Sequence, residues 1–299
     1  METRAFGQKE RVRSVASRGG RRPAHTENGP RVPIFGQGTW QMEHDARREA
    51  IAALRRGLDL GLRHIDTAEM YGSGAVEEMV AEAIEGRRDE VFLVSKVLPE
   101  NATRRGTVIA CERSLKRLRT DHLDCYLLHW ESRHPLAGTL EALEELREAG
   151  KVRSYGVSNF DEERLRETVS LAGPGRIACD QALYHLEERH ADTGLIALCQ
   201  KLGAAFVAYS PFGSGAFPAP ASPGGKVLAA IARAHRKTPR QVALAFLTRL
   251  PGTFAIPKAA SRVHVEENAG AIGLKLSAEE ISRIEEAFPA RRRAELPTL

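Results

Sequence analysis

Eight short apolar runs, each followed by a segment of helical period, constrain the fold of this 299-residue chain more than any other feature. The segments after the runs repeat apolar residues at spacings of three and four, as amphipathic helices do. Strands that alternate with helices form a parallel sheet, and eight such units in about 250 residues predict a single-domain (β/α)8 barrel of the α/β class. The expected strands cover residues 34–39, 63–66, 91–96, 123–129, 153–158, 176–181, 205–210 and 253–258.

Helix-end signals accompany several of the expected helices. Gly150 after the segment TLEALEELREA is a C-cap signal, Asp161 is an N-cap signal, and Ser277 with Glu280 forms an S-x-x-E capping box. A doubly wound open sheet is the alternative fold, but GQGTWQ (36–41) does not complete the G-x-G-x-x-G phosphate loop of such folds. The remaining helices are expected near residues 45–60, 75–86, 103–118, 192–202, 226–236, 239–249 and 262–271.

The whole net charge of +5 comes from residues 1–31, which hold eight arginines and lysines against three glutamates. The rest of the chain is neutral, so we expect no basic face and no nucleic-acid partner for the body of the fold. Residues 1–31 are polar and interrupted by glycine and proline, which predicts a disordered N-terminal arm. A targeting peptide and a phosphate-binding tail are the alternatives for this arm, and its glutamates weaken the first. The expected barrel domain covers residues 32–288, followed by a short tail of residues 289–299.

The apolar runs and the cysteines indicate the cellular compartment of the protein. No apolar run approaches the roughly 20 residues that cross a bilayer, and no secretory signal is visible, so no membrane partner is expected. Four scattered cysteines without a C-x-x-C pair argue against a zinc ribbon and suit reduced thiols. We therefore expect a cytoplasmic protein, and a monomer. The cysteines are Cys111, Cys125, Cys179 and Cys199.

Polar side chains follow three successive strands of the expected barrel. Asp66, Lys96 and His129 end their strands, and Tyr71 lies in the loop after the first of them. Catalytic groups of such barrels lie at the carboxyl ends of the strands, although each of these residues could also simply cap its strand in solvent. An ammonium group lowers the pKa of a neighbouring phenol from its ordinary value of about 10, and a carboxylate keeps that ammonium charged. Together, the phenol, the ammonium and the carboxylate predict a site that protonates a carbonyl oxygen while a hydride is transferred to the carbonyl carbon. The nearby His64 is expected to face a neighbouring helix.

Three long segments resemble the aldo-keto reductase family over residues 32–288. They are GLRHIDTAEMYGSGAVEEMVAEAI (61–84), DHLDCYLLHW (121–130) and IPKAASRVHVEEN (256–268). The resemblance implies a (β/α)8 barrel, in agreement with the strand count. It also implies a catalytic tetrad of Asp66, Tyr71, Lys96 and His129, with Tyr71 as the general acid.

The same resemblance implies an NADPH cofactor bound without a Rossmann domain, with NADH as a possible replacement. Tyr209 would stack on the nicotinamide, and the loop 210–225 would cross the pyrophosphate, where glycines let backbone N–H groups approach. Many members carry arginine where this chain has His264, and Arg262 is the candidate substitute at the 2′-phosphate. The implied cofactor-binding residues are Ser158, Asn159, Gln181, Tyr209, Ser210, Pro211, Gly213, Ser214, Lys258, Ala259, Ser261, Arg262, His264, Glu267 and Asn268.

The substrate end of the expected site is less constrained. Trp40 and Trp130 would wall the pocket, and the short tail implies a shallow, open site. The chain resembles short-tailed bacterial members of the methylglyoxal and 2,5-diketo-gluconate reductase type, which implies small aldehyde substrates. A cofactor-binding auxiliary subunit of a channel, with little turnover, is one alternative.

A metal-dependent barrel with His64 and Asp66 as ligands is the other alternative. It would need several histidines at strand ends, where only His129 and His185 also qualify, so no metal is expected.

Overall fold

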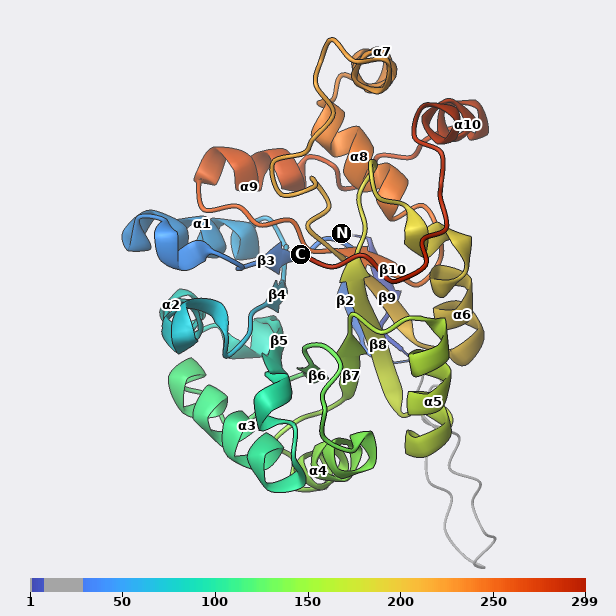
Figure 1. Ribbon diagram of the computed structural model, residues 1–299. Coiled ribbons are helices and arrows are strands. Elements are labelled where there is room, and N and C mark those ends of the chain that lie inside the picture. The colour runs from blue at the N-terminus through green and yellow to red at the C-terminus, as the bar shows by residue number, and fades with distance from the viewer. Residues whose placement is uncertain (1, 8–28) are drawn as a thin grey trace, which may run out of the picture.

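Eight parallel strands form the centre of the molecule, and helices surround them (Figure 1). The computed structural model describes residues 2–7 and 29–299. Every expected barrel strand is present, and the strands are neighbours in chain order. Their bounds are β3 Gln37–Gly38, β4 His64–Asp66, β5 Phe92–Val97, β6 Cys125–Leu128, β7 Tyr155–Ser158, β8 Ile177–Leu183, β9 Ala205–Tyr209 and β10 Thr253–Ala255.

The sheet closes between its first and last strands. Parallel bridges join Phe35 to Ala255 and Gly38 to Lys258, and the Gly38 amide donates to the Pro257 carbonyl at 3.2 Å. A side chain at position 38 would place its Cβ 2.5 Å from a backbone oxygen of β10's continuation, so the close approach of these strands requires glycine. The predicted (β/α)8 barrel is therefore confirmed.

The helices lie on the outside of the barrel, each after the strand that the sequence places before it. Asp161 caps its helix by accepting a hydrogen bond from the Arg164 amide, and Ser277 forms the expected capping box. Among the described residues no helix is long and apolar enough to cross a membrane. The helices are α1 Arg47–Asp59, α2 Ala75–Ala83, α3 Arg104–Leu118, α4 Leu136–Glu148, α5 Glu162–Ala172, α6 Leu195–Leu202, α7 Pro223–His235, α8 Pro239–Leu247, α9 Arg262–Ala269 and α10 Ala278–Ala287. Short 3-10 turns are η1 Met42–His44, η2 Tyr71–Gly74, η3 Arg88–Glu90, η4 Pro99–Asn101 and η5 His190–Thr193.

A two-stranded hairpin precedes the barrel, so the described ends of the predicted disordered arm, residues 2–7 and 29–31, are ordered. Strand β1 (Thr3–Ala5) pairs antiparallel with β2 (Arg31–Pro33). The Arg4 guanidinium donates hydrogen bonds to the backbone carbonyls that follow α8, including those of Thr248 and Leu250 at 2.7 Å each. These partners are distant in sequence, so local composition gives no sign of them. Residues 8–28 of the expected arm lie outside the described residues.

The floor of the barrel is an aromatic cluster around the end of this hairpin. Phe6 is 2% exposed, and its ring lies 4.8 Å from that of Phe92 and 5.2 Å from that of Phe254. His64 completes the cluster, edge-on to Phe6 at 5.8 Å, so the prediction that it faces a helix is wrong. Both His64 ring nitrogens are buried without a hydrogen-bond partner in the described part of the chain. Burial lowers the pKa of His64 from its ordinary value to about 4.

Candidate active site

A buried ammonium joins a carboxylate and a phenol at the carboxyl end of the barrel. Lys96 on β5 donates to Asp66 Oδ1 at 2.6 Å and to the Tyr71 hydroxyl at 3.1 Å. Asp66 ends β4, and Tyr71 begins η2 five residues later, so the turn brings the phenol back over the strand end. Lys96 is fully buried. The structure therefore brings together three of the four predicted tetrad residues by direct hydrogen bonds.

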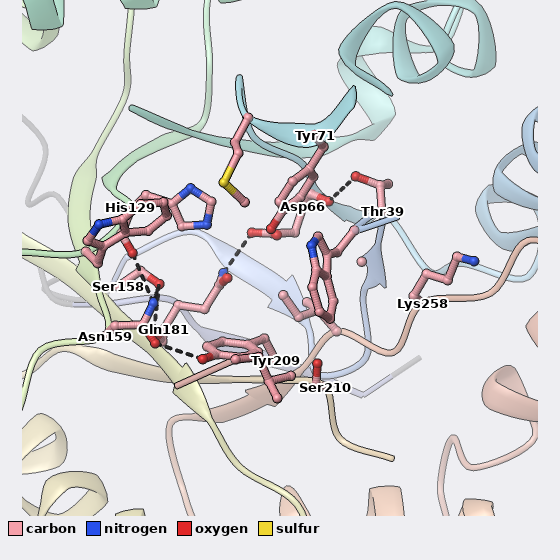
Figure 2. Close-up of a pocket in the computed structure, with 16 residues that line it drawn as sticks. Thr39, Asp66, Tyr71, His129, Ser158, Asn159, Gln181, Tyr209, Ser210 and Lys258 are labelled. Atoms are coloured by element: carbon pink, nitrogen blue, oxygen red, sulfur yellow. Dashed lines mark hydrogen bonds between the residues drawn. The ribbon is translucent and has the colours of Figure 1, made fainter. Parts of the chain in front are cut away.

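The Asp66 carboxylate is held from a second side. Gln181 on β8 donates its side-chain amide to Asp66 Oδ2 at 2.7 Å, and Thr39 donates to the Asp66 backbone carbonyl at 2.8 Å (Figure 2). Lys96 also donates to the Thr67 carbonyl at 3.0 Å, which fixes the ammonium between Asp66 and Tyr71. Both carboxylate oxygens are therefore occupied, and the orientation of the Lys96–Asp66 pair is set by three strands.

The electrostatics differ from the prediction at Tyr71. Burial raises the pKa of Tyr71, and the lowering effect of Lys96 does not overcome it. For Lys96, burial by itself lowers the pKa, but Asp66 and Tyr71 together raise it above its ordinary value. The ammonium therefore stays charged and the phenol keeps its proton at neutral pH. The expectation of a lowered Tyr71 pKa is wrong for the protein alone, because it left out the desolvation of a buried phenolate.

His129 follows β6 and lies beside Tyr71. The two rings are edge-to-face at 5.8 Å between centroids, and the Trp130 ring lies 4.7 Å from that of His129. Burial, with a smaller contribution from Lys96, lowers the pKa of His129 to about 2. The imidazole is therefore neutral across the physiological pH range. A neutral imidazole donates one hydrogen bond and accepts another.

These side chains line one pocket of about 700 Å³, measured with its solvent-open mouth. Figure 2 shows the labelled residues arranged around it, with Lys258 at one edge, its amine directed away from Asp66. Eleven predicted residues line the pocket, namely Trp40, Asp66, Tyr71, His129, Trp130, Ser158, Asn159, Gln181, Tyr209, Ser210 and Lys258. Five lining residues were not predicted, namely Gly38, Thr39, Met70, Ile256 and Leu299.

The polar side chains of β7, β8 and β9 and of Asn159, which follows β7, fit the amide and ring of a nicotinamide. The Tyr209 hydroxyl donates to Asn159 Oδ1 at 2.9 Å, and Asn159 Nδ2 donates to the His129 carbonyl at 3.1 Å. Asn159 has a positive φ of 61°, a strained conformation that tends to occur at functional sites. Ser158 and Gln181 lie next to Asn159, and the Ser158 hydroxyl donates to the Gln181 backbone carbonyl at 2.8 Å. An aromatic face bordered by amide and hydroxyl groups suits a flat ring that carries a carboxamide.

The loop after β9 contributes Ser210 to the pocket, whereas Pro211, Gly213 and Ser214 lie outside its lining. Positive φ angles at Ser210 and Ser214, both 47°, fold the loop back sharply. Beyond this turn the guanidinium of Arg240 on α8 lies over the rings of two loop phenylalanines, at 5.7 Å from Phe212 and 4.9 Å from Phe217. The loop is thereby fixed to α8.

The predicted adenosine-end residues are only partly gathered. Lys258 lines the pocket, but the other six residues from this segment do not. Ser261 caps α9 by accepting from the His264 amide at 3.3 Å. Arg262 lines a separate depression between α1 and α9, so the structure does not bring it to the pocket beside Lys258. The other three are Ala259, Glu267 and Asn268, the last of which is buried.

The C-terminal tail reaches the pocket, a contact that the sequence did not predict. The Arg293 amide donates to His190 Nδ1 at 2.9 Å, and its guanidinium pairs with Glu188 at 2.8 Å. These contacts guide the tail across the strand ends, and Leu299 lines the pocket. No local sequence signal predicts this, because the contacts join residues more than 100 positions apart.

In residues 2–7 and 29–299, no group of three histidine, cysteine or acidic side chains could hold a metal ion. The four cysteines are buried free thiols.

A closed barrel whose strand ends carry a buried Lys–Asp pair on a tyrosine is an arrangement suited to an oxidoreductase of carbonyl groups. The model of the Aldo/keto reductase family matches residues 35–288, and the chain belongs to this family. The expected class of enzyme is thereby confirmed.

Similar proteins agree with the branch of the family expected from the sequence. The methylglyoxal reductase YeaE of Escherichia coli is 43% identical over 261 residues, covering 87% of this chain and 92% of the relative. The glyoxal reductase of Bacillus subtilis is 33% identical over 264 residues, covering 86% and 90%. A crystal structure of an aldo/keto reductase from Klebsiella pneumoniae, in complex with NADP and acetate, has a TM-score of 0.84 at 42% identity, covering 90% and 96%.

Proposed function

We propose that this protein reduces the carbonyl group of small aldehydes and keto-aldehydes of the methylglyoxal type to alcohols, with NADPH as the coenzyme. The observation that carries the proposal is the 3.1 Å hydrogen bond from the Lys96 ammonium to the Tyr71 hydroxyl, with Asp66 on the other side of the lysine at 2.6 Å. Asp66 and Tyr71 of this relay line the pocket, next to the side chains that suit a nicotinamide, and Lys96 lies directly behind them.

Tyr71 is the proton donor in this proposal. When it gives its proton to the carbonyl oxygen, the Lys96 ammonium stabilises the phenolate that remains, and Asp66 keeps the lysine charged and in place. The neutral His129 donates a hydrogen bond to the same oxygen and orients the carbonyl. NADPH, when bound, supplies the hydride that reaches the carbon.

The coenzyme and the substrate occupy different walls of the pocket in this proposal. Ser158, Asn159 and Gln181 hold the carboxamide, and Tyr209 stacks on the ring. Trp40, Trp130, Met70 and Leu299 form the apolar wall, which limits the substrate to a small aldehyde. The names of the methylglyoxal and glyoxal reductases among the relatives support this substrate class. The monomeric state and the cytoplasmic location stay predictions.

The test combines turnover with coenzyme binding. Loss of nicotinamide absorbance is measured with methylglyoxal and with 4-nitrobenzaldehyde, for the wild type, Tyr71→Phe and a control, Tyr126→Phe. Tyr126 is buried outside the pocket lining, so its hydroxyl is not expected to affect turnover. We expect Tyr71→Phe to lower kcat by about 10²- to 10⁴-fold, the usual contribution of a general acid, while NADPH still binds. A wild type that binds NADPH and reduces neither aldehyde would contradict the proposal and favour a cofactor-binding auxiliary protein.

A further inference from the structure

Lys258, which follows β10, pairs with a carboxylate from the segment that follows β3. It forms an ion pair with Asp45, which follows η1, just after β3 in the chain. The bridge between Gly38 and Lys258 places the two segments side by side. The side chains of Lys258 and Asp45 are 34% and 31% exposed, so the pair lies near the protein surface, beside the pocket that Lys258 lines.

This pairing matters because Lys258 is the one lysine or arginine among the residues that line the pocket. Arg262, the predicted second cation at the 2′-phosphate, lines the depression between α1 and α9 together with Arg48 and Arg55 of α1. Across the described ranges, Asp45 is the one carboxylate within 4 Å of the Lys258 ammonium. The positive charge that the pocket offers to an anion is thus already partly balanced by the protein itself.

We propose that Asp45 is a specificity-determining residue that reduces the preference for NADPH over NADH. The inference rests on the proposed function, and it takes Lys258, one of the cofactor-binding residues that the family resemblance implies, as the group that meets the 2′-phosphate. NADPH carries a dianion at the position where NADH carries a hydroxyl, so charges near this position discriminate between them. Asp45 competes with the 2′-phosphate for Lys258 and repels it, because like charges a few ångströms apart at a protein surface are unfavourable. The hydroxyl of NADH experiences neither effect.

Asp45→Asn tests this with a binding measurement rather than with turnover. Trp40 and Trp130 line the pocket, so quenching of their fluorescence reports the Kd of each coenzyme without any substrate. The matched control is Glu49→Gln, which removes an exposed carboxylate from the first turn of α1 that makes no ion pair within the described ranges. Asp45→Glu keeps the charge, and thermal unfolding shows that each variant is folded.

The expected result is a change in the Kd of NADPH with little change in the Kd of NADH. Asp45→Asn should lower the Kd of NADPH by about three- to fivefold, the upper part of the range that exposed ion-pair energies give, and change that of NADH by less than about twofold. 2′-AMP should gain affinity in the same way and 5′-AMP should not. Glu49→Gln and Asp45→Glu should stay close to the wild type.

Other results would overturn the inference. Weaker binding of both coenzymes by Asp45→Asn would mean that the ion pair helps to hold the coenzyme rather than to select it. Equal Kd values in the wild type and in Asp45→Asn would mean that Asp45 has no influence on Lys258. A wild type that binds neither coenzyme would instead contradict the proposed function, and with it this inference.

Discussion

Gln181 donates its side-chain amide to Asp66 across the barrel, over a separation of 115 residues, at 2.7 Å. The other oxygen of the same carboxylate accepts from Lys96 at 2.6 Å. One carboxylate thus connects β8, which carries a proposed coenzyme ligand, with β5, which carries the lysine beside Tyr71. The binding and proton-transfer parts of the site share this residue, so its geometry is set by both.

Asp66→Asn should destabilise the protein by about 3–5 kcal/mol, because a buried ammonium loses its counterion. The free energy of unfolding in urea measures this. The double variant Asp66→Asn with Lys96→Met removes both charges, so it should lose less stability than the single variant. A double variant that is less stable than the single one would show that the buried ammonium is not the source of the loss.

His129 should not contribute a pH dependence to turnover. Its pKa is lowered to about 2, so the imidazole is neutral at every pH at which the enzyme is assayed. His129→Gln should lower kcat/KM by about 10²-fold, through loss of the hydrogen bond to the substrate oxygen. The shape of the pH profile between about pH 5 and 9 should be unchanged. If the wild-type pH profile of kcat/KM shows an inflection near the ordinary histidine pKa, and this inflection is absent in His129→Gln, the neutral state of His129 would be contradicted.

His64→Phe should change how stability depends on pH. The pKa of His64 is lowered to about 4 in the folded protein, so between its ordinary value of 6.5 and 4 the unfolded chain binds a proton that the folded one does not. His64 therefore costs no stability above pH 6.5. As the pH falls from 6.5 toward 4, it lowers the free energy of unfolding by up to about 3 kcal/mol. Phenylalanine fits the aromatic cluster and does not titrate.

The measurement for His64 is urea unfolding of both proteins at several pH values. All other titrating groups are shared, so the difference between the two free energies isolates this residue. We expect the free energy of unfolding of His64→Phe, relative to that of the wild type, to increase as the pH falls from 7.5 to 4. A constant difference over this range would show that His64 is not protonated preferentially in the unfolded chain.

Phe6→Ala should destabilise the barrel by about 3–5 kcal/mol through the cavity that it leaves among Phe92, Phe254 and His64. Turnover at low temperature should be close to that of the wild type, because the cluster lies at the end of the barrel opposite the strand carboxyl ends. Thermal unfolding measures the first and aldehyde reduction the second. Leu171→Ala, at a side chain that is 51% exposed, serves as the control and should change Tm little.

The sequence was sufficient for features that depend on local pattern. The eight strands, the cap at Asp161 and the box at Ser277 follow from periodicity and short-range hydrogen bonds. The juxtaposition of Asp66 with Lys96 followed from the rule that parallel strands present their carboxyl ends on the same face.

The features that the sequence did not predict depend on contacts between distant segments or on burial. Phe6 is ordered because the barrel floor accepts it, and Leu299 lines the pocket because Arg293 contacts residues more than 100 positions earlier. The pKa of Tyr71 depends on how completely the surrounding chain excludes water. Arg262 was placed by the spacing of a motif, whereas its side chain follows the packing of α9 against α1.

The bonds of Arg4 also determine when the barrel can be completed during synthesis. Its guanidinium donates to carbonyls of Thr248, Leu250 and Thr253, which lie 244 to 249 residues later. Because Arg4 precedes these partners by more than 240 residues, it leaves the ribosome well before they do and waits for them. Contacts of such sequence separation are slow to form. Until they form, Phe6 stays exposed and the barrel floor is open, which makes the late, unclosed barrel the species most at risk of aggregation.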